Sequence, residues 1–293
     1  MSPVRAHTSL LSWPALAFLI VFMLIPLGTM AYISFLERAP FGGVQWGHYS
    51  LVAYEKLVFE KDLLGRMAFN QDYIEIFARS LRLAAGTTLI TLVVGFPTAF
   101  FMTSLSPRMA AAFLFLVTFP FWTNLLVRNF AWILILRNGG PLENLLVGLG
   151  LITSPIDILY TPFATAIGLT YSFLPFMILP IYVALERIER PLIEAAFDLG
   201  ADRWDTIRRI VLPLAMPGIA AGAILVFVPC LGAYVSPELL GGGKSMMIGN
   251  LVQAQFGAAR NWPFGAALAV VLVLVMLGAL AIVARLRRRE VLA

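Results

Sequence analysis

Long apolar stretches dominate the sequence, and most charged residues lie in the segments between them. A helix needs about 20 residues to cross a bilayer. Apolar runs of this length predict transmembrane helices at residues 13–36, 83–103, 109–136, 158–185, 214–236 and 262–284. The pattern therefore predicts an all-α integral membrane protein, with six transmembrane helices in a single domain that covers residues 1–293.

The fourth and fifth spans contain prolines in or beside their apolar runs, namely Pro162, Pro175, Pro180, Pro217 and Pro229. Each proline removes a backbone hydrogen bond. In a membrane this is tolerated where the helix lines a water-filled cavity or packs against a neighbour. We therefore expect these two spans to be able to bend, with the fifth span broken near Pro229.

The third span contains a charged residue. The span runs from Met109 to Val127 and continues to Leu136 if Arg128 lies inside the membrane. An intramembrane charge usually faces the interior of a bundle or a functional path. In the alternative interpretation the span ends at Val127 and Arg128 reaches the interface, and the sequence leaves both interpretations open.

The segments outside the spans are also informative. Residues 37–76 carry mixed charge, and we expect some amphipathic helix there that caps the outer surface of the bundle. The first apolar run is too long for a signal peptide, and no small-residue cleavage site follows it, so we expect a permanent anchor. Residues 246–256 have apolar residues at approximately helical spacing, which predicts a short helix that re-enters the outer rim.

Composition supports a membrane protein and excludes several classes of site. Of 293 residues, 60% are hydrophobic and 13% are charged, whereas soluble domains carry about 25% charged residues. The single cysteine, Cys230, cannot form an intrachain disulfide, and His7 lies far in sequence from His48. We therefore predict no catalytic residues and no metal site. The net charge of +5 comes largely from arginines that flank the spans, so it does not indicate nucleic-acid binding.

A charged segment, residues 186–213, separates the fourth and fifth spans. Within it, Glu194 to Leu199 predicts a short helix, and Gly200 suits the left-handed backbone that ends many helices. Asp202 is a good N-cap for a second helix that runs toward Ile210. Pro213 would restrict that helix or begin the next one.

Several positions in this segment follow a fixed pattern: Glu194, Ala195, Ala196, Gly200, Ile210, Leu212 and Pro213. The pattern resembles the loop that marks the permease subunits of bacterial ABC importers. The resemblance implies the type I importer permease fold, in which this loop is cytoplasmic and its short helix couples to the ATP-hydrolysing subunit. It implies a coupling role for these residues and for Asp198 between them. The alternative is an amphipathic interfacial hairpin that docks to nothing.

Further stretches are similar to the spermidine/putrescine branch of these permeases. These stretches are residues 120–128, 171–177, 237–242, 247–250, 255–256 and 262–265. The resemblance implies half of a translocation pathway for a small cationic solute. Relatives for opines, amino-acid derivatives or ferric iron share much of this scaffold, so another small solute remains an alternative.

The resemblance also implies partners. They are a second homologous permease, two copies of a cytoplasmic ATPase, a periplasmic solute-binding protein and membrane lipid. We expect no cofactor in this chain, because ATP would be bound by the partner subunit, and no nucleic-acid partner. The chain would be a non-catalytic subunit of the bacterial inner membrane. The count of basic residues on the two sides of the membrane is almost even and does not decide the orientation. Because the loop must face the ATPase, both termini are expected in the cytoplasm and residues 37–76 in the periplasm.

Aromatic and acidic residues near the outer end of the bundle are candidates for the pathway. Ammonium groups are stabilised by carboxylates and by aromatic faces. Glu238 follows the fifth span, and Tyr234 lies one helical turn before it. Trp122, Asn124 and Tyr171 are candidates for the rest of the lining. In the alternative interpretation, Glu238 caps a short outer helix and the aromatic residues only pack the bundle.

Two other functional readings are not favoured. Gly241-Gly242-Gly243-Lys244-Ser245 resembles a phosphate-binding loop, but the required first glycine is replaced by Glu238. We interpret this run as a flexible outer turn. A stand-alone secondary carrier would be expected to have broken helices with acids near the midplane, and no acid lies near the middle of any predicted span.

Overall fold

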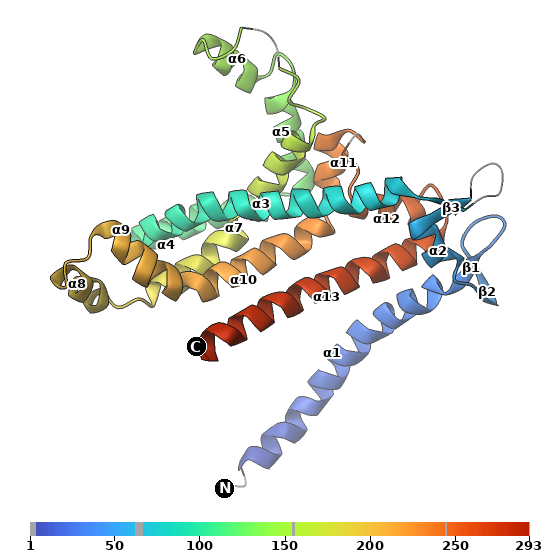
Figure 1. The fold of residues 1–293 in the computed structure, drawn as a ribbon, viewed down its shortest axis with the longest axis horizontal. Coiled ribbons are helices and arrows are strands. Elements are labelled where there is room, and N and C mark those ends of the chain that lie inside the picture. Colours follow the sequence, from blue (N-terminus) through green and yellow to red (C-terminus); the bar gives the residue numbers. More distant parts are fainter. Residues whose placement is uncertain (1–3, 62–66, 154–155, 244, 293) are drawn as a thin grey trace. The chain divides into compact units, whose positions relative to one another are not determined.

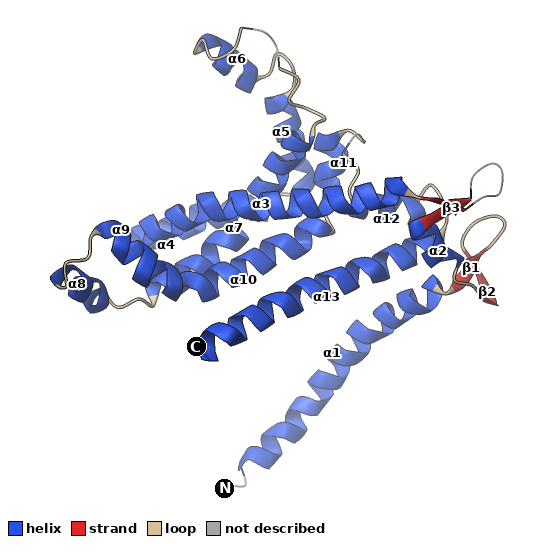
Figure 2. Cartoon of the chain, viewed as in Figure 1, coloured by secondary structure: helices blue, strands red, loops and turns tan. Residues whose placement is uncertain are grey.

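A computed structural model describes residues 4–61, 67–153, 156–243 and 245–292. The fold is mostly helical, with two short β-hairpins (Figures 1 and 2). The chain divides into two compact units, one made of residues 1–74 and 251–275 and the other of residues 75–250 and 276–293. We call them the hairpin unit and the core unit and describe each separately.

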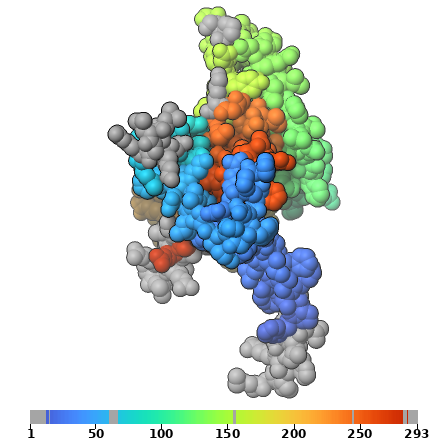
Figure 3. Space-filling model, turned by 90° about the vertical axis from the view of Figure 1, so that its right-hand side faces the viewer, coloured from blue at the N-terminus to red at the C-terminus, as the bar shows by residue number. Residues whose placement is uncertain are grey.

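The hairpin unit begins with a long helix and continues with short elements. These are α1 (Val4–Ser34), β1 (Leu36–Arg38), β2 (Val44–Tyr49), α2 (Val52–Val58), β3 (Phe59–Lys61) and β4 (Met67–Phe69). The strands form two antiparallel hairpins, β1–β2 and β3–β4. The residues from β1 to α2 gather on the face that Figure 3 turns to the viewer, in blue.

The segment at residues 37–76 was expected to contain amphipathic helix, and α2 agrees with that expectation, but the two hairpins were not predicted. The first hairpin forms because Gly42 and Gly43 adopt positive φ angles of 91° and 85°, which glycine tolerates at a tight turn. Two hydrogen bonds join this hairpin to the residues just before α13. Gly43 N–H donates to the Arg260 carbonyl (2.8 Å), and the Arg38 side chain donates to the Ala259 carbonyl (2.9 Å).

The core unit is built from long helices and several short ones. In chain order they are α3 (Gln71–Thr103), α4 (Pro107–Thr118), the 3-10 turn η1 (Phe119–Trp122), α5 (Leu125–Leu136), α6 (Pro141–Gly148), α7 (Pro162–Glu186), α8 (Arg190–Asp198), α9 (Arg203–Thr206), the π-helical turn η2 (Ile207–Val211), α10 (Leu212–Leu231), α11 (Val235–Gly241), α12 (Ile248–Phe256) and α13 (Trp262–Leu292). The first turn of α3, and parts of α12 and α13, belong to the hairpin unit.

Helices α7 and α10 form the centre of the core unit. They approach closely at two glycines of α10, because a Cβ at Gly218 would lie 2.5 Å from the Pro180 carbonyl oxygen, and one at Gly222 would lie 2.8 Å from the Met177 sulfur. Small residues permit this close backbone approach between membrane helices. At Gly95 of α3 an added Cβ would again contact Met177, at 3.1 Å. The three helices therefore pack around Met177, which is fully buried.

Five described helices are long and apolar enough to cross a membrane. A sixth span results if α4–η1 and α5–α6 count as one, although the pair is bent by 94°. The third span was expected as one run over residues 109–136, so its continuity is corrected here. Pro120 and the extended backbone of Thr123 stop the first part, and the Asn124 side chain caps the second by accepting from Leu126 N–H (2.8 Å).

The fifth span also differs from its expected bounds. Helix α10 ends at Leu231, and α11 begins at Val235, so residues 214–236 are not one helix. A break was expected near Pro229, and the chain leaves the helix just after it, at residues 232–234. In the first helix, α1, residues 16–33 are not buried, as expected for a segment that contacts lipid or a partner.

Candidate coupling and translocation sites

The predicted end of the short helix near Gly200 is confirmed, although the helix begins at Arg190 and not at Glu194. Helix α8 runs to Asp198, and Gly200 adopts a φ of +84°. Two hydrogen bonds close the turn, from Gly200 N–H to the Phe197 carbonyl (2.9 Å) and from Ala201 N–H to the Ala196 carbonyl (3.0 Å). This pair is the Schellman arrangement, which satisfies carbonyls that the helix end leaves open.

The second half of the loop starts as predicted and continues differently. The Asp202 carboxylate accepts from Asp205 N–H (2.6 Å) and so caps α9. The second helix was expected to run toward Ile210, with Pro213 restricting it or beginning the next one; instead α9 continues through η2 into α10, giving one helix over Arg203–Leu231. Pro213 has no N–H to donate to the preceding turn. The adjacent turn is π-helical, with Leu212 N–H bonded to the Ile207 carbonyl.

The coupling segment exposes both charge and apolar surface. Glu194 and Asp198 are exposed on α8, whereas Ala196 is buried on its inner side. Leu199 at the tip is 88% exposed, and Trp204 is 68% exposed. Exposed apolar side chains beside charges are typical of a surface that binds another protein. The remaining pattern residues lie where η2 joins α10: Leu212 and Pro213 are exposed, and Ile210 is half-buried.

Charges at the two ends of α8 oppose the helix dipole. Arg190 is the first residue of the helix and Asp198 the last. A cation at the N-terminus and an anion at the C-terminus each cost about 0.3–1 kcal/mol relative to the opposite arrangement. These charges therefore do not stabilise α8 through the helix dipole.

The outer candidate residues Tyr234 and Glu238 are joined by a third residue. The Glu238 carboxylate accepts from the Asn250 side-chain amide (2.8 Å), and the same nitrogen donates to the Tyr234 carbonyl (2.9 Å). The Asn250 oxygen accepts from Met247 N–H (3.3 Å). Asn250 is buried, whereas Glu238 is exposed and Tyr234 is half exposed. The sequence analysis did not identify Asn250 as a candidate. Its only signal there was the similarity of residues 247–250 to spermidine/putrescine permeases.

The other three pathway candidates are not brought together with this group. Trp122 is 83% exposed in η1, and Asn124 serves as the cap of α5. Tyr171 makes an edge contact with Trp132 at 5.6 Å between ring centroids. Within the described ranges, no recorded hydrogen bond or ring contact links these residues to Glu238.

Arg128 and the glycine run can also be placed. Arg128 lies in the first turn of α5, beyond the 94° bend, so it is not inside a continuous third span. Its Nε atom is buried, and it has no hydrogen-bond partner among the described residues. Gly242 has a φ of +58° and ends α11, in agreement with a turn at residues 241–243. Lys244, the other key residue of the apparent phosphate loop, lies outside the described residues.

The model of the family described as "Binding-protein-dependent transport system inner membrane component" matches residues 92–290. This match covers more than half of the chain and includes the whole coupling segment. The chain belongs to this family. The permease is therefore a transport subunit of an inner-membrane system, as the pattern at residues 194–213 indicated.

Several relatives of this permease are similar over most of its length. The spermidine/putrescine transport system permease protein PotB of Escherichia coli (strain K12) is 40% identical over 258 residues, covering 88% of this chain and 90% of the relative. PotB of Haemophilus influenzae (strain Rd) is 43% identical, covering 71% and 73%. The molybdenum transport system permease protein ModB of Azotobacter vinelandii is 33% identical, covering 68% and 89%.

Solved structures support the fold. A bacterial ABC transporter that imports the acidic polysaccharide alginate matches with a TM-score of 0.72 at 17% identity, covering 97% of this permease and 95% of that chain. An inward-facing MetNI methionine ABC transporter matches with a TM-score of 0.54 at 20% identity, covering 74% and 94%. These likenesses show the type I importer permease fold predicted from the sequence.

Proposed function

We propose that this permease forms half of the translocation pathway of an ATP-driven importer for polyamines such as spermidine and putrescine. The observation that carries the proposal is the 40% identity to PotB over 88% of the chain. The exposed Glu238 carboxylate supports a cationic solute, since a carboxylate offers more acceptor positions than the one Asn250 uses. The alternative is another small solute, which the 33% identity to ModB favours.

In this proposal the permease acts with partners and does not hydrolyse ATP itself. The proposed partners are a second homologous permease, two copies of a cytoplasmic ATPase and a periplasmic solute-binding protein. Helix α8 with the Gly200 turn docks on the ATPase, because this end of the core unit exposes Leu199, Trp204 and two acids. Both termini would then lie in the cytoplasm, and the two hairpins of residues 36–69 in the periplasm.

The pathway proposal centres on Glu238. Asn250 fixes one carboxylate oxygen and ties it to the backbone of Tyr234, so the acid is held in place before any solute arrives. A preorganised carboxylate loses little entropy on binding a cation. Trp122, Asn124 and Tyr171 remain proposed lining residues and would meet the solute on other parts of its path.

The proposal is tested by uptake of radiolabelled putrescine and spermidine into proteoliposomes that contain the permease, its neighbouring permease and ATPase gene products, and the loaded binding protein. We expect ATP-dependent accumulation of at least one polyamine, and no accumulation when the ATPase carries an inactive nucleotide site. Thermal-shift screening of the binding protein against polyamines, molybdate and amino-acid derivatives gives an independent readout. Stabilisation by another class and no polyamine uptake would overturn the solute assignment.

A further inference from the structure

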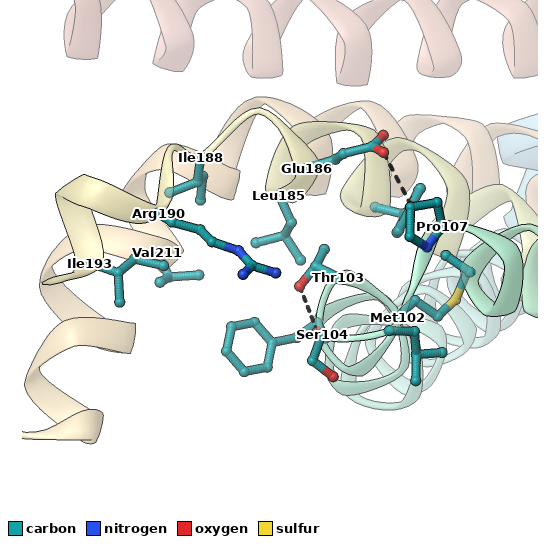
Figure 4. A pocket seen from close by; sticks show the side chains of 14 residues that line it. Met102, Thr103, Ser104, Pro107, Leu185, Glu186, Ile188, Arg190, Ile193 and Val211 are labelled. Atoms are coloured by element: carbon teal, nitrogen blue, oxygen red, sulfur yellow. Dashed lines mark hydrogen bonds between the residues drawn. The ribbon is translucent and has the colours of Figure 1, made fainter.

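A cavity of about 480 Å³ lies where α8 approaches the ends of two long helices. The C-terminal end of α3 forms one side of it, the C-terminal end of α7 another, and α8 with η2 the third (Figure 4). Leu185, Ile188, Ile193 and Val211 supply apolar wall. The charged residues that line it, Arg190 and Glu186, remain exposed to solvent.

The Arg190 side chain enters this cavity from the first residue of α8. Figure 4 shows its guanidinium group pointing toward Thr103, at the last residue of α3. At the N-terminus of its own helix this positive charge is unfavourable. At the C-terminal end of α3 the same charge is favourable, because the aligned peptide dipoles of that helix leave partial negative charge there. The orientation of Arg190 thus has a physical reason in α3 and none in α8.

The end of α3 is prepared to accept hydrogen bonds. Thr103 Oγ1 donates to the Phe100 carbonyl (2.7 Å), and Ser104 Oγ donates to the Phe101 carbonyl (2.6 Å). Each hydroxyl has used its only hydrogen, so its oxygen can act only as an acceptor toward other groups. A guanidinium group has five donors and no acceptor, which makes it the complementary partner.

Glu186 is the competing partner for Arg190, since it also lines the cavity. Its carboxylate accepts from the Tyr182 hydroxyl (3.3 Å), on the opposite side of the cavity in Figure 4. Among the described residues the structure shows neither an ion pair between Arg190 and Glu186 nor a hydrogen bond from Arg190 to Thr103, so the choice between the two partners rests on the direction of the guanidinium group in Figure 4. The orientation of the guanidinium therefore favours the α3 end over Glu186.

We propose that Arg190 is a positioning residue that ties α8 to the end of α3, so that movement of α8 reaches α3 as well as α10. Helix α8 is linked to α10 through the chain itself, by α9 and η2. Helix α3 ends at Thr103, far from α8 in sequence, and the two helices line the same cavity. This inference rests on the proposed coupling role of α8. It adds a route by which movement of α8 is transmitted to α3, the first long helix of the core unit.

The first test measures coupling in the reconstituted complex. Arg190→Gln and Thr103→Val each remove one side of the proposed contact, and Arg190→Lys keeps the charge but not the planar donor set. We expect solute transported per ATP hydrolysed to fall about tenfold in Arg190→Gln, the scale of losing one charge-assisted contact. Arg190→Lys should recover part of the loss. In the double variant, Thr103→Val should add little to Arg190→Gln, because both changes break one interaction.

The matched control is Arg108→Gln. Arg108 is an exposed arginine in the first turn of α4, and it does not line the cavity. This variant should keep the wild-type ratio of transport to hydrolysis. Three results would overturn the proposal: an unchanged ratio in Arg190→Gln, fully additive effects in the double variant, or loss of the ATPase from the complex with Arg190→Gln. The last result would make Arg190 a docking contact instead.

The second test does not depend on which solute is carried. Spin labels at Ser106 and Arg203, in a background where Cys230→Ala removes the single cysteine, report the distance between the α3–α4 turn and α9. With the ATPase bound, adding ATP should leave this distance unchanged in the wild type and change or broaden it in Arg190→Gln. An identical response in both would overturn the proposal. If no polyamine is transported, the proposed solute fails, while this measurement still decides the role of Arg190.

Discussion

Replacing Gly200 by valine tests the coupling helix through backbone strain alone. Gly200 has a φ of +84°, and no atom lies within 4 Å of the position where a Cβ would be. A larger side chain therefore meets no steric contact, and its cost comes from the left-handed backbone. For a β-branched residue we take this cost as about 2 kcal/mol, which is roughly a 30-fold change in an equilibrium constant. The two hydrogen bonds that close the turn, at Gly200 and Ala201, are lost when the chain relaxes.

The expected consequence is a smaller population of the docking-competent loop. Apparent affinity falls in proportion to that population, so Gly200→Val should bind the ATPase about 30-fold more weakly when titrated in nanodiscs. ATP-driven uptake should fall at limiting ATPase, while membrane insertion is unchanged. Gly200→Asn is the matched control, because asparagine tolerates the left-handed region, and it should stay within about threefold of wild type. Equal affinity and equal uptake in Gly200→Val and wild type would refute the docking assignment.

Three further predictions follow from named contacts. Asp202→Ala removes the cap of α9 and should lower stability by about 1 kcal/mol in thermal unfolding, whereas Asp202→Asn should not, since asparagine caps equally well. Glu238→Gln keeps an acceptor for Asn250 but removes the charge. Uptake of a dicationic solute should then fall about tenfold, while complex assembly and basal ATPase activity stay intact. Unchanged uptake would remove Glu238 from the pathway. The permease purified alone should not hydrolyse ATP, and detectable activity in a clean single-subunit preparation would contradict the proposed division of labour.

Local signals in the sequence predicted the coupling loop well. A glycine after a short helix and an aspartate two residues later have specific backbone roles, and both residues perform them. Apolar length also placed the long helices, because crossing a bilayer sets a minimum run. These predictions succeed because each depends on only a few neighbouring residues.

Other features depend on geometry that apolar length does not encode. Residues 109–136 are apolar on both sides of Asn124, so hydropathy cannot show that the chain turns by 94° there. The hydrogen bond from Asn250 to Glu238 joins residues twelve positions apart across a turn. The position of Arg190 over the end of α3 likewise requires the fold, since the two helices are far apart in the sequence.

The packing of α7 against α10 connects the two candidate sites physically. The coupling segment leaves α7 at Glu186 and re-enters the bundle as the continuous α9–η2–α10 helix, so no flexible linker separates Gly200 from the centre of the core unit. At Gly218 and Gly222 there is no space for an added Cβ, so α10 cannot slide past α7 without moving it. At its other end α7 packs against α11, where a Cβ at Gly241 would lie 2.9 Å from Thr165 Oγ1. If the proposed docking of α8 moves α10, that movement would be shared by α7, and the helix that carries Glu238 packs directly against α7.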